Sequence, residues 1–202
     1  MQKLVYCARI KTMRKKTSLH DNYDVNFILK GFTSILAGIY MIVGVYLMQS
    51  ILSGFLIENN PLGMLSAEII ELLFVGILFF VVMGASLALI FGGRRDAKKF
   101  QYKLWNRKTK KIAFQYLLLV AMVFFTLIIL MNVGQIDALT PTFLLLYALF
   151  LFRLKNKNRA QLLLLSGLAL LLAICCFFIP SYWASTLYVL GIGHIAYGVI
   201  IR

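Results

Sequence analysis

Long apolar stretches are the feature of this sequence that most limits how it can fold. Six of them follow one another, at about Ile28–Leu52, Ile69–Gly92, Ile112–Met131, Ala138–Phe152, Gln161–Ile179 and Tyr182–Ile201. A helix that crosses the ~30 Å hydrocarbon core of a bilayer needs about 20 residues, with a range of about 17 to 25. Five stretches meet that length directly. The fourth is shorter and meets it only if Arg153 and Lys155 extend toward the lipid headgroups.

These stretches indicate helices rather than the strands of a membrane barrel. Barrel strands alternate apolar and polar residues over about 10 positions, whereas runs such as 117–125 (LLLVAMVFF) are apolar throughout. The chain is 61% hydrophobic and 14% charged, against about half and about a quarter in an average soluble domain. The sequence therefore predicts an all-α polytopic membrane protein. This composition excludes a soluble enzyme, a secreted disulfide scaffold and a disordered regulator.

The basic residues lie in alternate connections between the stretches. Seven precede or begin the first stretch, nine lie between the second and third, four lie between the fourth and fifth, and Arg202 ends the chain, which accounts for all 21. The other connections carry Glu58, Glu68 and Asp137, or no charge. Because short cytoplasmic loops are enriched in Lys and Arg, we predict six transmembrane helices with both termini in the cytoplasm.

This topology divides the chain into three kinds of segment. Residues 1–27 form a basic cytoplasmic segment, 28–202 form the six-helix domain, and 93–111 form a basic cytoplasmic loop. The first 27 residues are too polar for the apolar region of a cleaved signal peptide, so the first span is expected to be an uncleaved anchor. The segment either fixes orientation or lies as an amphipathic surface element on anionic lipid.

The basic loop is a candidate surface for anionic lipid. Each Lys or Arg beside a membrane gains about 1 kcal/mol from anionic headgroups. Nucleic acid would be attracted by the same charge, but no recognition module accompanies it, so we expect no nucleic-acid partner. The residues expected at the headgroups are Arg94, Arg95, Lys98, Lys99, Lys103, Arg107, Lys108, Lys110 and Lys111.

His194 is the ionisable side chain expected deepest in the membrane. It shares a helical face with Gly191 and Gly198, three residues before it and four after it. Small residues allow another helix to approach closely, so this face should point into the bundle. At ~1.5 Å per residue, His194 lies ~18 Å beyond Tyr182. It is either a neutral imidazole that hydrogen-bonds a neighbouring helix or a group that relays protons or contacts a ligand.

Glu71 is the second candidate polar site. It lies one turn after Glu68 near the outer end of the second span. The pair has the spacing to bind a cation or exchange a proton, although helix capping and solvation at the interface also account for two acidic residues there. The rise per residue separates Glu71 from His194 by ~15 Å along the membrane normal, so we expect no contact between them.

The remaining motifs indicate packing rather than chemistry. Ser166, Ala169, Ala173 and Cys176 form a small-residue stripe, and Ser34 with Gly38 and Gly84 with Ala88 form small-residue pairs. Cys175 and Cys176 are neighbours in the fifth span, so a disulfide between them is not expected. The sequence contains no phosphate-binding Gly loop, metal-ligand cluster or catalytic triad. We therefore predict no cofactor, no metal and no catalytic residue.

The last hairpin resembles the repeated hairpin of the HdeD-like family of small bacterial membrane proteins. The resemblance is carried by the run 167–172 (GLALLL), the Phe178-Ile179-Pro180 turn, Leu190-Gly191-Ile192 with Ile195, and Gly198-Val199. It covers about 40 residues, and the first four spans match poorly. It implies a non-catalytic protein linked to acid-stress tolerance, and no functional residue is carried over from the family.

The sequence thus predicts a non-catalytic protein of the bacterial inner membrane with an accessory, stress-related or scaffold role. The alternative is a small transporter or channel component that functions as an oligomer, because one buried histidine offers little to coordinate a solute. The expected partners are anionic lipid and, through self-association or assembly, other membrane proteins.

Overall fold

The fold is all-α throughout the described residues. The computed structural model describes residues 29, 31–56, 66–99, 104–153 and 159–200. Its elements are the α-helices α2 (Phe32–Leu56), α3 (Ala67–Lys99), α4 (Arg107–Asn132), α5 (Leu139–Arg153), α6 (Arg159–Phe178) and α7 (Trp183–Ile200), and the short 3₁₀ helices η2 (Ile136–Ala138) and η3 (Pro180–Tyr182).

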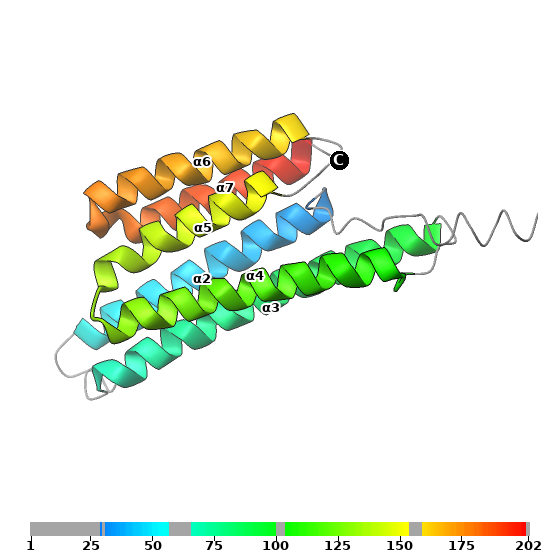
Figure 1. Cartoon of the computed structure of the whole chain (residues 1–202). Helices are drawn as coiled ribbons and strands as arrows, with labels where there is room; N and C mark the ends of the chain where they lie inside the picture. Colours follow the sequence, from blue (N-terminus) through cyan, green and yellow to red (C-terminus); the bar gives the residue numbers. More distant parts are fainter. Residues whose placement is uncertain (1–28, 30, 57–65, 100–103, 154–158, 201–202) are drawn as a thin grey trace, which may run out of the picture.

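The helices run side by side in two layers of three. In one layer α2 lies between α3 and α7, and in the other α5 lies between α4 and α6. The layers are joined where α6 packs on α7. Consecutive helices alternate in direction, so the start of α2 and the end of α7 lie at the same end of the bundle (Figure 1). The far ends of α3 and α4 project beyond the other four helices there.

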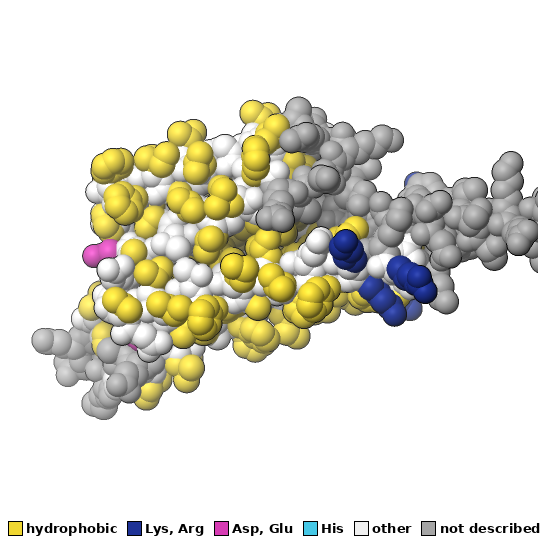
Figure 2. All heavy atoms as spheres, in the orientation of Figure 1, with side chains coloured by type: hydrophobic (Ala, Val, Ile, Leu, Met, Phe, Trp, Pro, Cys, Tyr) yellow, Lys and Arg dark blue, Asp and Glu magenta, His cyan; other side chains and the backbone are white. Residues whose placement is uncertain are grey.

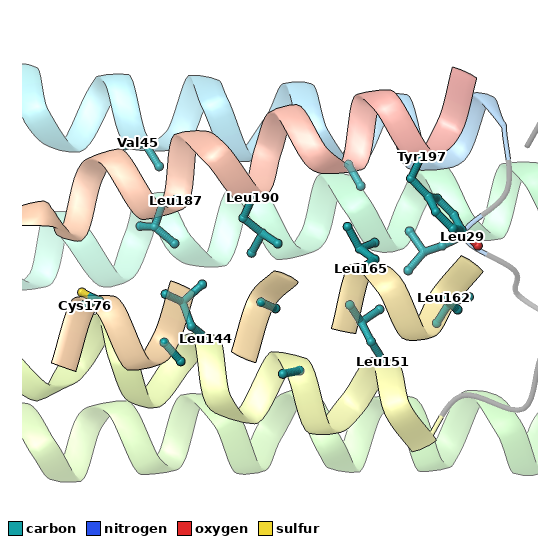
Figure 3. Close-up of a cluster of buried hydrophobic side chains, with 14 of the residues drawn as sticks. Leu29, Val45, Leu144, Leu151, Leu162, Leu165, Cys176, Leu187, Leu190 and Tyr197 are labelled. Atoms are coloured by element: carbon teal, nitrogen blue, oxygen red, sulfur yellow. The ribbon is translucent and has the colours of Figure 1, made fainter. Parts of the chain in front are cut away.

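The hydrophobic core lies between the layers, on the side away from α3 and α4. Figure 3 shows leucines of α5 and α6 pointing toward leucines of α7 and Val45 of α2. The buried residues of this cluster come from α2 with the preceding Leu29, and from α5, α6 and α7. Ala85 and Leu89 of α3 pack on it only partly buried, and no described residue of α4 belongs to it.

The exterior is apolar, as expected of a chain that lies in lipid. Four helical segments are long and apolar enough to cross a membrane: Phe32–Leu56, Ile69–Lys99, Thr109–Asn132 and Pro180–Ile200. Two shorter apolar helices accompany them, at Ile136–Phe152 and Leu162–Phe178. Figure 2 shows apolar side chains spread over the visible face, with basic side chains gathered at one end and an acidic side chain at the other. The all-helical, membrane-embedded class predicted from the sequence is confirmed at this level.

The helix boundaries differ from the predicted ones where charge was taken as a sign of a loop. The segment 93–111 is not a continuous loop, because α3 runs through Arg94, Arg95, Lys98 and Lys99, and α4 begins at Arg107. Lys and Arg are good helix formers, so a charged helix continues past the apolar part without a break. The first helix likewise begins at Phe32 and ends at Leu56, four residues later at each end than predicted.

Local capping explains where α4 begins and how it connects to α5. Asn106 has extended backbone angles, and its side-chain oxygen accepts hydrogen bonds from the Thr109 backbone N–H at 2.7 Å and the Thr109 hydroxyl at 2.9 Å. This is the standard N-cap arrangement. After α4, Gly134 has a φ of 76°, which favours glycine. The short helix η2 then leads directly into α5.

Candidate functional site

The buried polar site is centred on His194 in α7. The side chain is 0% exposed, as is that of Ser34 in α2. The Nε2 atom of His194 lies 2.6 Å from the hydroxyl oxygen of Tyr147 in α5, and Nδ1 lies 3.3 Å from the Ser34 Oγ. The Ser34 hydroxyl also donates to the His194 backbone carbonyl at 2.9 Å. The site therefore joins three helices from both layers.

The geometry assigns the protons of this network. Ser34 has one hydroxyl hydrogen, which it donates to the His194 carbonyl. Its oxygen must then accept from Nδ1–H, which leaves Nε2 without a hydrogen and able to accept from the Tyr147 hydroxyl. Both ring nitrogens are satisfied by a neutral imidazole. A charged ring would place a hydrogen on Nε2, which would then require Tyr147 to accept instead of donate.

Glycines bring α2 and α7 close enough for these bonds to form. A Cβ atom added at Gly38 would lie 2.5 Å from the Gly191 carbonyl oxygen, and one at Gly198 would lie 2.6 Å from the Gly31 carbonyl oxygen. Both distances are shorter than a carbon–oxygen contact allows, so a side chain at either position would separate the helices. The structure places Gly191, His194 and Gly198 together on the face of α7 that meets α2, as their spacing predicts.

Aromatic rings surround the Tyr147 side of the site. The ring of Tyr147 stacks on Phe143 with centroids 6.0 Å apart and lies 6.3 Å from Phe150. The centroids of Tyr147 and His194 are 5.6 Å apart. The role of Tyr147 could not be predicted from the sequence, because an aromatic residue inside an apolar run carries no signal of a hydrogen-bonding role. Ser34 was identified only as a small packing residue.

Glu71 lies apart from this network. It is half-buried near the start of α3, and the hydrogen bonds of His194 run to Ser34 and Tyr147 instead. The side chain of Glu68 lies outside the described residues, so the predicted acidic pair stays a prediction. Among the residues described, no group of three His, Cys, Asp or Glu side chains is placed to hold a metal.

A second polar contact joins α3 to α4. The Ser86 hydroxyl donates to the Val82 carbonyl at 2.6 Å, so its oxygen accepts from the Tyr116 hydroxyl at 2.7 Å. The ring of Tyr116 lies 5.9 Å from that of Phe150 in α5. The sequence analysis did not single out either residue.

The basic residues of α3 and α4 lie at one end of the bundle. We name this group the basic end, and it comprises the exposed side chains of Arg94, Arg95 and Lys98 on α3 and of Arg107, Lys110 and Lys111 on α4. Lys99 is also exposed. Lys103 and the side chain of Lys108 lie outside the described residues. Two free cysteines are described, of which Cys175 is exposed and Cys176 is buried.

Comparison with known proteins assigns no family. No family model matches the chain, and no curated protein or solved structure matches it. The interpretation of the site therefore depends on its own geometry.

Proposed function

We propose that this chain is a six-span protein of the bacterial inner membrane without catalytic activity, with an accessory, stress-related or scaffold role. The observation that carries this proposal is the completeness of the His194 network. Both ring nitrogens have partners inside the bundle, and the side chain has no exposed surface. A group that relays protons or binds a solute needs access to that proton or solute, whereas a structural joint between helices needs only its partners.

The topology is part of the same proposal. The described basic side chains gather at one end of the bundle (Figure 2), which supports placing that end in the cytoplasm. The fourth and fifth stretches, which become the shorter helices α5 and α6, would also span the bilayer, because they pack against helices that are long enough to do so. Anionic headgroups are the expected partners of the basic end. The likeness of the last hairpin to HdeD-like proteins is compatible with a stress-related role.

A test of the proposal measures stability and proton movement in the same variants. Hydrogen bonds inside membrane proteins average ~0.6 kcal/mol and reach ~1.7, so His194→Ala and Tyr147→Phe should each lower the stability by about 1 kcal/mol. Tyr188→Phe is the matched control, because the Tyr188 hydroxyl joins the same two helices α2 and α7 through an exposed bond of 3.0 Å to Gln49. Tyr188→Phe should lower the stability by less than His194→Ala or Tyr147→Phe does.

The alternative function is transport, and one observation favours it. Tyr147, His194 and Ser34 form a chain of groups that each carry an exchangeable proton. Under a pH gradient, liposomes containing the protein should admit protons no faster than empty ones if the accessory proposal is correct. Faster entry that His194→Ala abolishes, with unfolding unchanged, would overturn it in favour of proton-linked transport.

A further inference from the structure

We infer that the outer side of the contact between α3 and α4 is a binding site for one anionic phospholipid, with its headgroup between Arg94 and Lys110. We name this surface the α3–α4 face, and it is formed by Phe80, Leu87 and Arg94 on α3 and by Lys110, Leu117 and Phe124 on α4. The inference rests on the proposed contact between the basic end and anionic headgroups, and it adds a specific site to that contact.

The first observation is that α3 and α4 are held together by few contacts. Their backbones stay farther apart than those of the other neighbouring helices, and the hydrophobic core lies elsewhere. Among the described residues, the Ser86–Tyr116 hydrogen bond of 2.7 Å joins them, as does the Phe79–Phe124 ring pair, whose centroids are 6.3 Å apart. This edge of the bundle is therefore less tightly closed than the rest.

The second observation is the register that these two contacts fix. Position 79 lies beside 124 and position 86 beside 116 in an antiparallel pair. Continuing the same register along both helices brings Phe80, Leu87 and Arg94 to within about two residues of the levels of Phe124, Leu117 and Lys110, an offset of at most ~3 Å at ~1.5 Å per residue. Two cationic side chains thus lie at nearly the same height at the basic end of the pair. Like charges at one level repel each other, and an anion between them removes that repulsion.

The third observation is that these residues form one stripe on each helix. Seven residues make nearly two helical turns, so positions 80, 87 and 94 share a face of α3, and positions 110, 117 and 124 share a face of α4. Helical geometry places both stripes on the same side of the contact, and on α3 this side is opposite to Ala85 and Leu89, which pack on the core. Phe80, Leu87 and Leu117 are 72%, 43% and 64% exposed. The surface below the two cations is therefore apolar and open to lipid.

The charges at the start of α4 lie where the helix dipole disfavours them. Arg107, Lys108, Lys110 and Lys111 lie in its first turns, and no acidic residue accompanies them in the first turn. The positive end of a helix dipole disfavours cations there, whereas the last turn of α3 favours its Lys98 and Lys99. An anionic ligand at this position would offset both the dipole and the mutual repulsion.

Geometry in the bilayer favours a lipid as the source of this anion. The headgroup layers add about 5 to 7 Å on each side of the hydrocarbon core. Arg94 follows the apolar part of α3 directly, and Lys110 precedes that of α4 by one residue. At ~1.5 Å per residue, both backbones lie within a few ångströms of the core boundary. A phosphate there continues into acyl chains that lie along Leu87, Leu117 and the two phenylalanines.

The test compares two double variants that remove the same charge. Arg94→Gln with Lys110→Gln removes the two cations of the α3–α4 face. The control double variant is Arg95→Gln with Arg107→Gln, since positions 95 and 107 face away from the α3–α4 contact by helical geometry. Native mass spectrometry of the full chain in non-ionic detergent would measure binding of phosphatidylglycerol, with phosphatidylcholine as the neutral lipid.

The first double variant should weaken phosphatidylglycerol binding by about 10- to 30-fold, as expected for two basic residues. The second should weaken it by less than about threefold, and thermal unfolding without lipid should be similar in both. An equal loss of binding in the two variants would overturn a specific site on the α3–α4 face while leaving general headgroup attraction intact. Glycerol phosphate, which carries the headgroup without chains, should not displace the lipid at equal concentration. Displacement would show that the site binds a free phosphate group instead.

Discussion

At the scale of single residues, glycines and one histidine determine how closely α2 and α7 pack. Gly38 and Gly191 let the two backbones meet, and His194 lies beside them with both nitrogens bonded. In lipid there is no water to satisfy a buried polar group that loses its partner. The close approach and the hydrogen bonds therefore depend on each other, because separating the helices would leave His194 unsatisfied.

The cost of adding a methyl group to a glycine should depend on what surrounds it. A Cβ at Gly198 would lie 2.6 Å from the Gly31 carbonyl oxygen and 2.9 Å from the Ile35 backbone nitrogen, which cannot move aside like a flexible side chain. We expect Gly198→Ala to destabilise the protein by about 1 to 3 kcal/mol, and Gly198→Leu by more. Unfolding in increasing sodium dodecyl sulfate, followed by circular dichroism, would measure this.

Gly167 provides the matched control for that substitution. It lies within α6, and a Cβ added there meets no atom within 4 Å. Because alanine has a higher helix propensity than glycine by up to about 1 kcal/mol, Gly167→Ala should be neutral or stabilising. If Gly198→Ala proved as harmless as Gly167→Ala, the close packing of α2 on α7 would be wrong.

The sequence predicts the environment of His194 better than its partners. Spacing alone places Gly191, His194 and Gly198 on one inward face, because a helix repeats regularly and small residues favour close packing. The identity of the partners depends on which helices meet and in what register. Ser34 lies 160 positions from His194 and Tyr147 lies 47 positions from it, and no local sequence pattern links residues so far apart.

At the scale of helices, packing decides which stripes are buried, and composition alone does not reveal where a helix ends. The stripe of Ser166, Ala169, Ala173 and Cys176 is buried in α6, and Ser166 donates a hydrogen bond of 2.8 Å to the Ala148 carbonyl of α5. The small residues of α6 thus allow close approach to α5.

The end of α3 was not predicted correctly, because a change from apolar to charged residues marks the edge of the membrane and not the end of a helix.

The packing of α5 on α6 should tolerate little added volume. Ala169 is 0% exposed in a cluster that includes Leu144, Ala148 and Leu151 of α5. Ala169→Leu should therefore destabilise the protein by about 1 to 3 kcal/mol through overpacking. Leu170→Ala, at the neighbouring position that is 45% exposed, should have little effect, because lipid chains are as apolar as leucine. Equal stability of Ala169→Leu and the unchanged protein in detergent unfolding would contradict this packing.

At the scale of the whole molecule, the ends of the bundle differ in charge. Glu71 and Asp137 lie at the end where α3 begins and α4 connects to α5, and the basic end lies opposite. The sequence predicts this segregation of charge because successive spans run in opposite directions. Alternate connections therefore lie at the same end of the bundle. The sequence does not predict that α3 and α4 lie at the open edge of two layers, since neighbours within the membrane are chosen by packing.

The topology can be tested with single cysteines in a version of the chain from which Cys7, Cys175 and Cys176 have been removed. Because the positive-inside rule places the basic end in the cytoplasm, a membrane-impermeant maleimide added to intact cells should label Asn60→Cys and Asp137→Cys but not Lys108→Cys. Asp137 is exposed between α4 and α5, which makes it the stronger of the two outer positions. Lysing the cells should make Lys108→Cys reactive, which controls for a buried thiol. Labelling of Lys108→Cys in intact cells would contradict the six-span arrangement, because α3 and α4 would then present their basic ends to the outside.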